Sequence, residues 1–386
     1  MQFEESQEDR EFRSRARDWL SDHVPNEDRP PSGPDMRAFD HKWQRTLFEG
    51  GWAGVAWPKE HGGLDLSIAH QLIWFEEYAL AGAPTAGTNW IALNHAGPTL
   101  IAKGIVEQQK RHVAAILCGD ETWCQGFSEP GAGSDLAGLA TRAVIDGDDL
   151  VINGRKIWTS YANYADYQEL LVRTDPAAPK HKGLSWIICD MRSEGIDIRP
   201  LYSMSGRQNF CEVTYEDVRV PLTNVVGGLN DGWAVAMTTL GIERGTAFVT
   251  EQMLLTSTVE ALIDVARKNG RDRDGEIAQR LAVVRSEAMA LKSMTYMNVS
   301  RIARTGAVGF ESSMTRLFFG ELTKRVAKLT YDVFDVDGLE ALEDGGIGPN
   351  SYYDAFRFSI AAGTSEIQRN IIGERILGLP RTGKSA

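Results

Sequence analysis

The chain has 386 residues, of which 42% are hydrophobic and 24% charged, and its formal net charge is -12. This is the composition of a globular protein with a large core, and the acidity argues against a nucleic acid as partner, because such binding needs a concentrated basic surface. No apolar run approaches the roughly 18 residues of a membrane helix, and the acidic start lacks the pattern of a secretory signal. We expect a cytoplasmic protein that does not span a membrane.

The four cysteines carry no sign of a disulfide framework or a metal site. They are Cys118, Cys124, Cys189 and Cys211. Four cysteines in so long a chain, none at zinc-ligand spacing, predict reduced and buried thiols.

Helical periodicity dominates the first third of the chain. Apolar or small residues recur at helical spacing after Ser6, namely Phe12, Ala16, Trp19, Leu20 and Val24. Another helix is expected to start near Ser67 and to run through IWFEEYAL, and the intervening WPKEHGGLD has the Pro and Gly content of a loop. We place an N-terminal α-helical domain at 1–122.

From about Trp123 the chain changes to short β-branched and aromatic runs separated by turn signals. We expect turns at DGDD near 146, at Asn153-Gly154 and at Gly195. In CEVTYEDVRVP, Val213 and Tyr215 alternate with polar residues, and Pro221 ends the pattern. These signals predict an antiparallel sheet or small β-barrel, and we place this middle domain at 123–225.

Helical periodicity returns beyond Gly232 and continues to the end. The first apolar stripe contains Phe248, Leu255, Val259, Leu262 and Ala266; the second Ile277, Leu281, Val284, Ala288 and Leu291; the third Leu317, Phe318, Leu322, Val326 and Leu329. With a shorter helix near 366–376, they predict a four-helix bundle as the C-terminal domain, at 226–386. The expected fold class is α+β, with helices, then strands, then helices.

Three segments suggest a ligand site, although each has a simpler explanation when taken alone. The first, Phe127–Asp135 (FSEPGAGSD), has glycines and hydroxyls that let backbone N–H groups approach an anionic or flat polar ligand, or it is a plain loop. In KIWTS, Trp158 can stack near an isoalloxazine with Ser160 hydrogen-bonded to it, or Trp158 is core. The third, AAGTSEIQRN, is a glycine turn before a capped helix that suits a phosphate or polarised carbonyl.

Together, in this order, GFSEPGAGSD, KIWTS and AAGTSEIQRNIIGERILGLPR resemble the acyl-CoA dehydrogenase family. EDVRVP at 216–221 and WPKEHGG at 57–63 also fit, so the resemblance covers essentially the whole chain. The family has an α domain, a middle β domain and a C-terminal four-helix bundle. The resemblance implies FAD-dependent α,β-dehydrogenation of an acyl-CoA to the 2-enoyl-CoA, with an electron-transfer flavoprotein as electron acceptor.

The resemblance also assigns cofactor contacts. By motif position, FAD would contact Phe127, Ser128, Gly133, Ser134, Trp158, Ser160, Thr364 and Glu366. Ser134 would also lie close to the CoA end of the substrate. Arg267 resembles an arginine that reaches the FAD pyrophosphate of a neighbouring subunit, although Gly270 replaces the aromatic residue that usually follows it.

The catalytic base is implied to lie on a bundle helix. Many family members have a glutamate where this chain has Ala362, whereas enzymes similar to isovaleryl-CoA dehydrogenase carry the base in a motif that Leu240–Arg244 matches. Glu243 would take the α-proton as a hydride leaves the β-carbon for flavin N5, while the Ala362 N–H and a flavin hydroxyl stabilise charge on the carbonyl oxygen. Arg244 would bind the CoA moiety. Apart from the motif, Glu243 would be read as an exposed helical carboxylate.

Two departures from the family pattern suggest a specialised enzyme. Asp332, Asp335 and Asp337 occupy the segment where relatives use a Gln-aromatic-Gly-Gly loop to hold a neighbour's FAD. This resembles the actinobacterial dehydrogenases of steroid side-chain breakdown, and predicts a tetramer with a second related subunit. Ala361 replaces a common tyrosine, which predicts room for a branched or polycyclic acyl group. The alternatives are a flavin oxidase or monooxygenase on the same scaffold, and a non-catalytic subunit.

Overall fold

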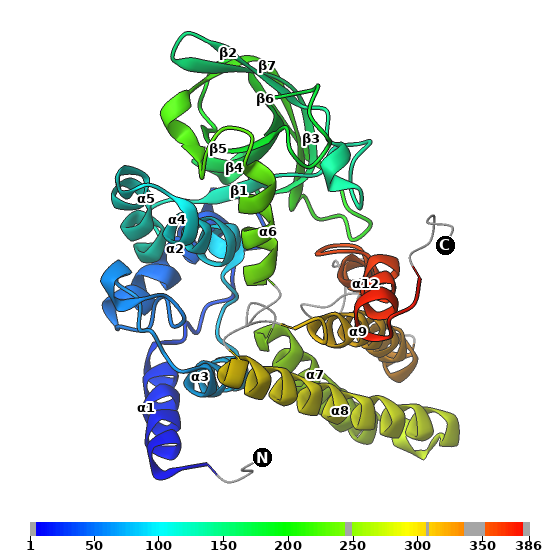
Figure 1. Cartoon of the computed structure of the whole chain (residues 1–386). Coiled ribbons are helices and arrows are strands. Elements are labelled where there is room, and N and C mark those ends of the chain that lie inside the picture. Colours follow the sequence, from blue (N-terminus) through cyan, green and yellow to red (C-terminus); the bar gives the residue numbers. More distant parts are fainter. Residues whose placement is uncertain (1–4, 244–248, 306–308, 336–351, 381–386) are drawn as a thin grey trace.

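The computed structural model describes residues 5–243, 249–305, 309–335 and 352–380. The N-terminal helices are α1 (Gln7–His23), α2 (Gly33–Glu49), α3 (Ile68–Leu80), the π-helix η3 (Ala92–Ala96), α4 (Gly97–Lys103) and α5 (Val106–Cys118). A β-sheet follows, and further helices complete the chain, in the order that the sequence predicts (Figure 1). The fold class is therefore confirmed. In the described part of the chain, no helix has the length and apolar character needed to cross a membrane.

The two helix starts predicted in the N-terminal part are both capped. The Ser6 hydroxyl accepts the backbone N–H of Asp9, whose carboxylate accepts the Ser6 N–H, so α1 begins with a capping box. The Ser67 hydroxyl accepts the backbone N–H of His70 at the start of α3. On α1, Phe12, Ala16 and Leu20 are buried, as the helical spacing predicts.

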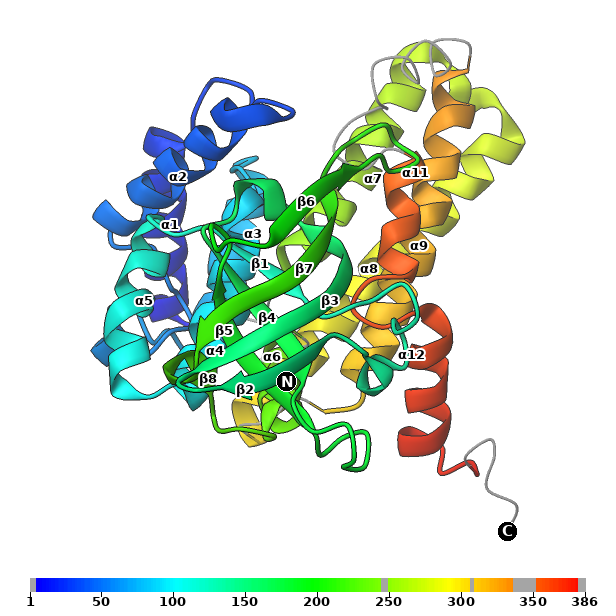
Figure 2. The same ribbon diagram turned by 90° about the horizontal axis from the view of Figure 1, so that it is seen from above.

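The middle part is a curved eight-stranded sheet within the described residues (Figures 1 and 2). Its strands are β1 (Trp123–Gly126), β2 (Arg142–Asp146), β3 (Asp149–Ser160), β4 (Tyr167–Arg173), β5 (Leu184–Asp190), β6 (Ile196–Leu201), β7 (Phe210–Pro221) and β8 (Val225–Val226). They are ordered β6-β7-β3-β2-β4-β5-β8, and β1 pairs with β4. Most pairs are antiparallel as predicted, but β1 and β2 run parallel to β4.

The prediction of a turn at Asn153-Gly154 is wrong. Strand β3 continues through both residues, and its pairing with β7 shifts register there. Gly154 has a φ of +153°, and a Cβ at this position would lie 2.6 Å from the Cα of Thr141. The glycine therefore serves a bulge and a close backbone approach. The predicted turn at DGDD is confirmed, since Gly147 connects β2 to β3 with a φ of +63°.

The C-terminal helices are α6 (Gly232–Glu243), α7 (Val249–Asn269), α8 (Gly275–Thr305), α9 (Ser312–Phe334), α11 (Tyr352–Ala355), the 3-10 helix η8 (Phe356–Ser359), α12 (Ser365–Ile371) and the π-helix η9 (Ile372–Ile376). The predicted stripes of α7, α8 and α9 meet in one core, and α12 packs against α9. Phe248, from the first stripe, lies outside the described residues. Helix α6 instead packs against β5, α4 and η3, where Val235 and Ala236 join the N-terminal core.

All four cysteines are buried and free. This confirms the prediction of reduced, buried thiols. Burial raises the pKa of each thiol, so the thiols are kept in their neutral, unreactive form.

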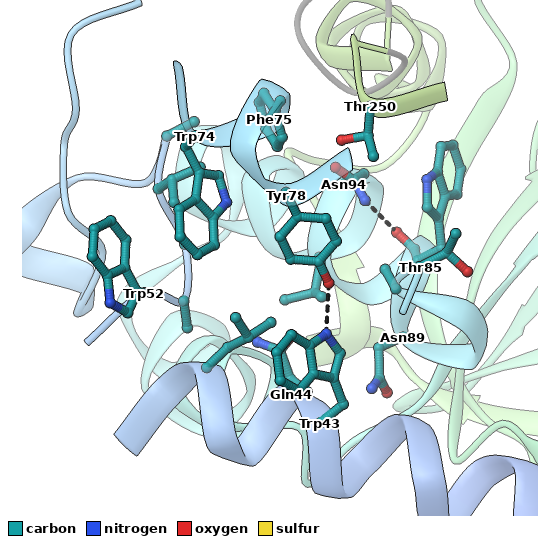
Figure 3. A pocket seen from close by; sticks show the side chains of 18 of the residues that line it. Trp43, Gln44, Trp52, Trp74, Phe75, Tyr78, Thr85, Asn89, Asn94 and Thr250 are labelled. Atoms are coloured by element: carbon teal, nitrogen blue, oxygen red, sulfur yellow. Dashed lines mark hydrogen bonds between the residues drawn. The ribbon is translucent and has the colours of Figure 1, made fainter. Parts of the chain in front are cut away.

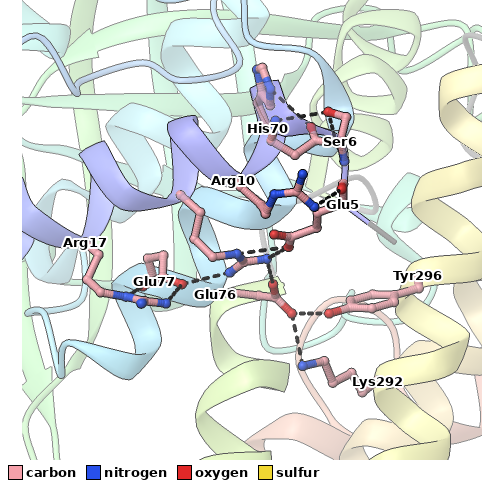
Figure 4. Close-up of polar contacts among 11 residues, drawn as sticks. Glu5, Ser6, Arg10, Arg17, His70, Glu76, Glu77, Lys292 and Tyr296 are labelled. Atoms are coloured by element: carbon pink, nitrogen blue, oxygen red, sulfur yellow. Dashed lines mark hydrogen bonds and ion pairs between the residues drawn. The ribbon is translucent and has the colours of Figure 1, made fainter. Parts of the chain in front are cut away.

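Two buried carboxylates on α3 connect the N-terminal helices to the bundle (Figure 4). Glu76 accepts hydrogen bonds from Arg13 of α1 and from the Tyr296 hydroxyl of α8, and its Oε1 lies 3.1 Å from Lys292 Nζ. Glu77 pairs with Arg13 at 2.7 Å and with Arg17 at 2.8 Å. Burial alone would raise the pKa of Glu76, but the bond from Tyr296 and the charge of Lys292 outweigh it and hold that pKa below its ordinary value of 4.5.

We expect Glu76→Gln to lower the free energy of unfolding by about 3 kcal/mol at neutral pH, because it removes the carboxylate that pairs with Lys292 and one of those that pair with Arg13. A carboxyl with a lowered folded-state pKa stabilises the fold above its unfolded pKa, and this contribution is lost as the pH falls through the folded value. The wild type should therefore lose stability below about pH 4.5 more steeply than the variant. Urea unfolding from pH 3 to 7 measures both effects.

Glu260→Gln is the matched control, because Glu260 is half-exposed and pairs with the exposed Arg285. Its stability should stay within error of the wild type. Equal losses in the two variants would contradict the structural role of Glu76.

Candidate active site

A buried lysine joins the first two motifs to each other. Lys156 on β3 is fully buried, and its Nζ donates to the Phe127 carbonyl at 3.0 Å and to Glu129 Oε1 at 2.9 Å. Glu129 also accepts the backbone N–H groups of Ala140 at 2.6 Å and Thr141 at 2.8 Å. This set of bonds fixes the loop after β1 against β3.

Each residue of this pair stabilises the charged form of the other and thereby opposes the effect of burial on its pKa. Burial lowers the pKa of Lys156 to about 8, although the Glu129 carboxylate acts in the opposite direction. Burial would raise the pKa of Glu129, but the Lys156 charge outweighs it and holds that pKa below its ordinary value. At neutral pH both groups are therefore largely charged. This ion pair was not predicted from the sequence. A lysine inside a buried strand nevertheless indicates a charged partner, because a lysine is almost never fully buried without one.

Trp158 is turned out of the sheet next to this pair. The register of β3 against β7 shifts between Lys156 and Thr159, and Trp158 has a φ of +61°. Normal alternation would place Trp158 on the same face as the buried Lys156, but the shift leaves it 56% exposed. Its ring meets that of Phe210 edge-on, with the centroids 6.0 Å apart.

The other residues predicted for this part of the site surround the same loop. Phe127 is buried, Ser128 and Ser160 are half-buried, and Gly133 and Ser134 are exposed. The Ser128 carbonyl accepts the N–H of Ile157 at 3.0 Å, so the loop and the strand are also joined through their backbones. A Cβ built at Gly133 would meet no atom within 4 Å. An exposed indole beside an open backbone loop fits a flat, ring-bearing cofactor.

The C-terminal turn presents an open backbone donor. Ala362 and Gly363 have φ values of +56° and +89°, and the side chain of Gln368 binds the carbonyl of Ala362 at 3.0 Å. The Thr364 hydroxyl caps α12 by accepting the N–H of Ile367, and Glu366 is exposed. Within the described residues, the Ala362 N–H makes no hydrogen bond. An open N–H on a rigid turn suits a carbonyl oxygen that gains negative charge.

Two links fix this turn relative to neighbouring elements. Arg316 Nη2 of α9 donates to the Ala361 carbonyl at 2.9 Å. From the loop between β6 and β7, Ser205 donates to Asp354 of α11 at 2.6 Å, and Arg207 lies 3.3 Å from the same carboxylate. The turn is therefore connected to the bundle, and α11, which precedes it, is connected to the loop between β6 and β7.

Three predicted residues remain, and the structure describes only one of them, Arg267, in full. Glu243 is the last residue of α6, and its side chain lies outside the described residues, as does the whole of Arg244. One turn before Glu243, the Thr239 hydroxyl bonds that of Thr99 on α4 at 2.8 Å. Arg267 is exposed on α7 and pairs with Asp264 at 3.2 Å.

Sequence reasoning did not predict an aromatic cavity of about 170 Å³ that lies beside η3 (Figure 3). Its walls include Trp43, Trp52, Trp74, Phe75, Tyr78 and Trp90, and Thr250 and Glu251 of α7 complete them. The Trp43 indole donates to the Tyr78 hydroxyl, which donates to the Pro84 carbonyl. The polar atoms of these two aromatic residues are thus already bonded. Because η3 packs on α6, the cavity lies close to that helix.

The acidic segment after α9 is less negative than its sequence suggests. Asp332 Oδ2 lies 2.6 Å from Arg280 Nη2, and Asp335 Oδ2 lies 3.5 Å from Arg271 Nη1. Asp337 lies outside the described residues. These partners come from α8 and from the turn before it, so the local charge cannot be read from the segment alone.

Comparisons with known proteins agree along the whole chain. Residues 6–120, 124–218 and 230–377 match the N-terminal, middle and C-terminal domains of acyl-CoA dehydrogenase. The chain is 37% identical to acyl-CoA dehydrogenase IpdE1 of Mycobacterium tuberculosis, over 97% of this chain and 98% of that protein. It is 35% identical to acyl-CoA dehydrogenase FadE26 of the same organism, over 86% of both chains.

Two solved structures are also similar. One is titled Tcur3481-Tcur3483 steroid ACAD, with a TM-score of 0.86 and 31% identity over 99% of this chain and 100% of that one. The other is the ChsE4-ChsE5 complex from Mycobacterium tuberculosis, with a TM-score of 0.82 and 31% identity over the same shares. Each title names two different proteins.

We expect Lys156→Met to lower flavin occupancy by on the order of tenfold or more, because it leaves Glu129 and the Phe127 carbonyl buried without their donor. The ratio of flavin to protein absorbance in the purified protein measures this. Lys180→Met is the matched control, since Lys180 forms an exposed pair with Asp135 of the same loop.

Adding Glu129→Leu to Lys156→Met should recover part of the free energy of unfolding that the single variant loses. Removing both buried charges costs less than leaving one of them without its partner. Normal flavin content in Lys156→Met would contradict the role given to this pair.

Proposed function

The chain belongs to the acyl-CoA dehydrogenase family, as its motifs predicted, and on this premise we propose that it converts a bulky acyl-CoA to the 2-enoyl-CoA. It is an oxidoreductase and an FAD-dependent flavoprotein, like its family. We also propose the cytoplasm as its location and an electron-transfer flavoprotein as its electron acceptor.

The residues around Trp158 fit FAD. In the proposed arrangement, the indole of Trp158 and the Ser160 hydroxyl hold the isoalloxazine, while the loop with Ser128, Gly133 and Ser134 follows the cofactor towards CoA. The supporting observations are the exposure of the indole and the open backbone at Gly133. Bound FAD supplies the electron acceptor for the reaction.

The open N–H of Ala362 is the observation that carries the proposed chemistry. A thioester α-proton is too weakly acidic for a free carboxylate, so charge on the carbonyl oxygen must be stabilised as the proton leaves. The Ala362 N–H binds this oxygen, Glu243 accepts the proton, and Arg244 binds CoA. Because Ala362 has no carboxyl, the base has to come from another element, and Glu243 ends the helix beside η3.

The aromatic cavity is the proposed site of the acyl group. An apolar cavity of about 150 Å³ holds one benzene ring. The cavity here, about 170 Å³, therefore suits one ring or a branched chain better than a complete fused steroid. Similarity to a steroid enzyme supports a fragment of such a molecule as substrate.

We expect Glu243→Gln to keep the fold and FAD but to lose dehydrogenation by on the order of 10² to 10⁴, because an amide of the same shape cannot accept the proton. Bleaching of the flavin by cyclohexylpropanoyl-CoA under anaerobic conditions measures the reductive step directly. Glu260→Gln, at an exposed glutamate of α7, is the control and should bleach at the normal rate. Bleaching at the normal rate in Glu243→Gln would remove Glu243 from this role.

We further propose that the chain works in a tetramer with a second, related subunit. Two similar structures each pair two different proteins, which supports this assembly. The acidic segment supports it as well, although Arg280 and Arg271 neutralise part of its charge. The aspartates of this segment replace glycine and amide groups where relatives receive a neighbour's cofactor, and a partner with the glycine loop would relieve this mismatch.

We expect the chain expressed alone to hold less than one FAD per subunit. Coexpression with a related dehydrogenase chain should give a tetramer in which a larger fraction of the FAD sites is occupied. Native mass measurement and flavin quantitation test both points. A stable, active homotetramer with tightly bound FAD on every subunit would show that the second chain is unnecessary.

A further inference from the structure

One carboxyl group in the aromatic cavity has no role in the chemistry described so far. Glu251 lies in the first turn of α7 and contributes to the cavity wall. Its Oε2 is buried and has no hydrogen-bond partner among the described residues. Among the described residues, Arg357 and Arg316 act on this carboxyl through their charge and not through a bond to Oε2. A buried carboxyl oxygen without a partner destabilises a fold, so Oε2 calls for a partner that the described residues do not supply.

The surroundings of Glu251 favour an uncharged partner. Burial raises the pKa of its carboxyl, while a hydrogen bond from its own backbone and the charges of Arg357 and Arg316 act in the opposite direction. The facing wall is aromatic, and the polar atoms of Trp43 and Tyr78 are already bonded to each other. An anionic ligand group would therefore find no cation on this wall, and a purely hydrocarbon group would leave the carboxyl unpaired.

Glu251 also lies near the proposed reaction centre. Arg316, whose charge reaches Glu251, donates to the Ala361 carbonyl beside the open N–H of Ala362. Along the chain, Glu251 follows Glu243 by eight residues. Arg316 thus relates Glu251 to the turn at which the thioester is proposed to bind.

We propose that Glu251 is a specificity residue, which hydrogen-bonds an uncharged oxygen substituent, a hydroxyl or a ketone, on the ring or branched part of the acyl group. A carboxyl can accept from a hydroxyl in either protonation state and can donate to a ketone when protonated. This assignment rests on the proposed function, and names an oxygenated ring-bearing acyl-CoA as the substrate class.

The test compares kcat/KM for cyclohexylpropanoyl-CoA, for its ring-hydroxylated and ring-ketone analogues, and for butanoyl-CoA. The wild type should prefer an oxygenated analogue over the parent ring by on the order of 10- to 100-fold, because a site built around a polar partner rejects the analogue that lacks it. Glu251→Leu should abolish or reverse this preference, and Glu251→Gln should keep part of it. Glu260→Leu, on the exposed face of the same helix, should leave the preference unchanged.

The outcomes separate the two proposals. Preference for the hydroxyl analogue alone identifies Glu251 as an acceptor, and preference for both identifies a protonated carboxyl. A wild type that dehydrogenates the parent ring without preferring either analogue overturns the role of Glu251 and leaves the proposed function intact. A Glu251→Leu variant that slows all substrates equally also overturns it, because that result indicates a structural role. Failure of every acyl-CoA to bleach the wild-type flavin overturns the proposed function itself.

Discussion

The buried ion pair between Lys156 and Glu129 is the interaction on which the candidate cofactor site depends. A lysine ammonium in the middle of a strand is costly to bury, and here a carboxylate and a carbonyl compensate it. The compensating groups belong to a glycine-containing loop, whose Phe127 and Ala132 also pack into the hydrophobic core. The charge therefore gives the loop the rigidity of the sheet, and the same stretch of β3 turns Trp158 outward. The shape of the candidate cofactor site thus depends on how one buried charge is paired.

Two faces of helix α3 make different contacts. Trp74, Phe75 and Tyr78 face the aromatic cavity, whereas Glu76 and Glu77 bind the arginines of α1, and Glu76 also binds α8. The cavity walls on α3 and α7 come from different parts of the chain, so their separation depends on how the N-terminal helices sit against the bundle. The ionic network sets that separation and thereby contributes to the shape of the pocket.

Local patterns in the sequence predicted the elements well, and contacts between distant segments explain what they missed. The stripes of α7, α8 and α9 are visible because helical burial repeats within one segment. The turn predicted at Asn153-Gly154 was wrong because a turn and a β-bulge both favour glycine. The close contact of Gly154 with the backbone of Thr141, which is distant in sequence, distinguishes the two. The cavity was invisible because its walls come from α2, α3, η3 and α7. Similarly, the acidic segment looked unfavourable because Arg280 and Arg271 lie far from it in sequence.

The outward turn of Trp158 has a consequence for how the molecule can be observed. Trp158 is the tryptophan that stands among the exposed large apolar residues, and the other nine are buried or half-buried. Its fluorescence should therefore emit at longer wavelength than theirs and should be selectively accessible to iodide in water. A ring stacked on the indole would remove both properties at once. The chain thus carries an intrinsic optical reporter of cofactor occupancy, at the residue that is proposed to contact the cofactor.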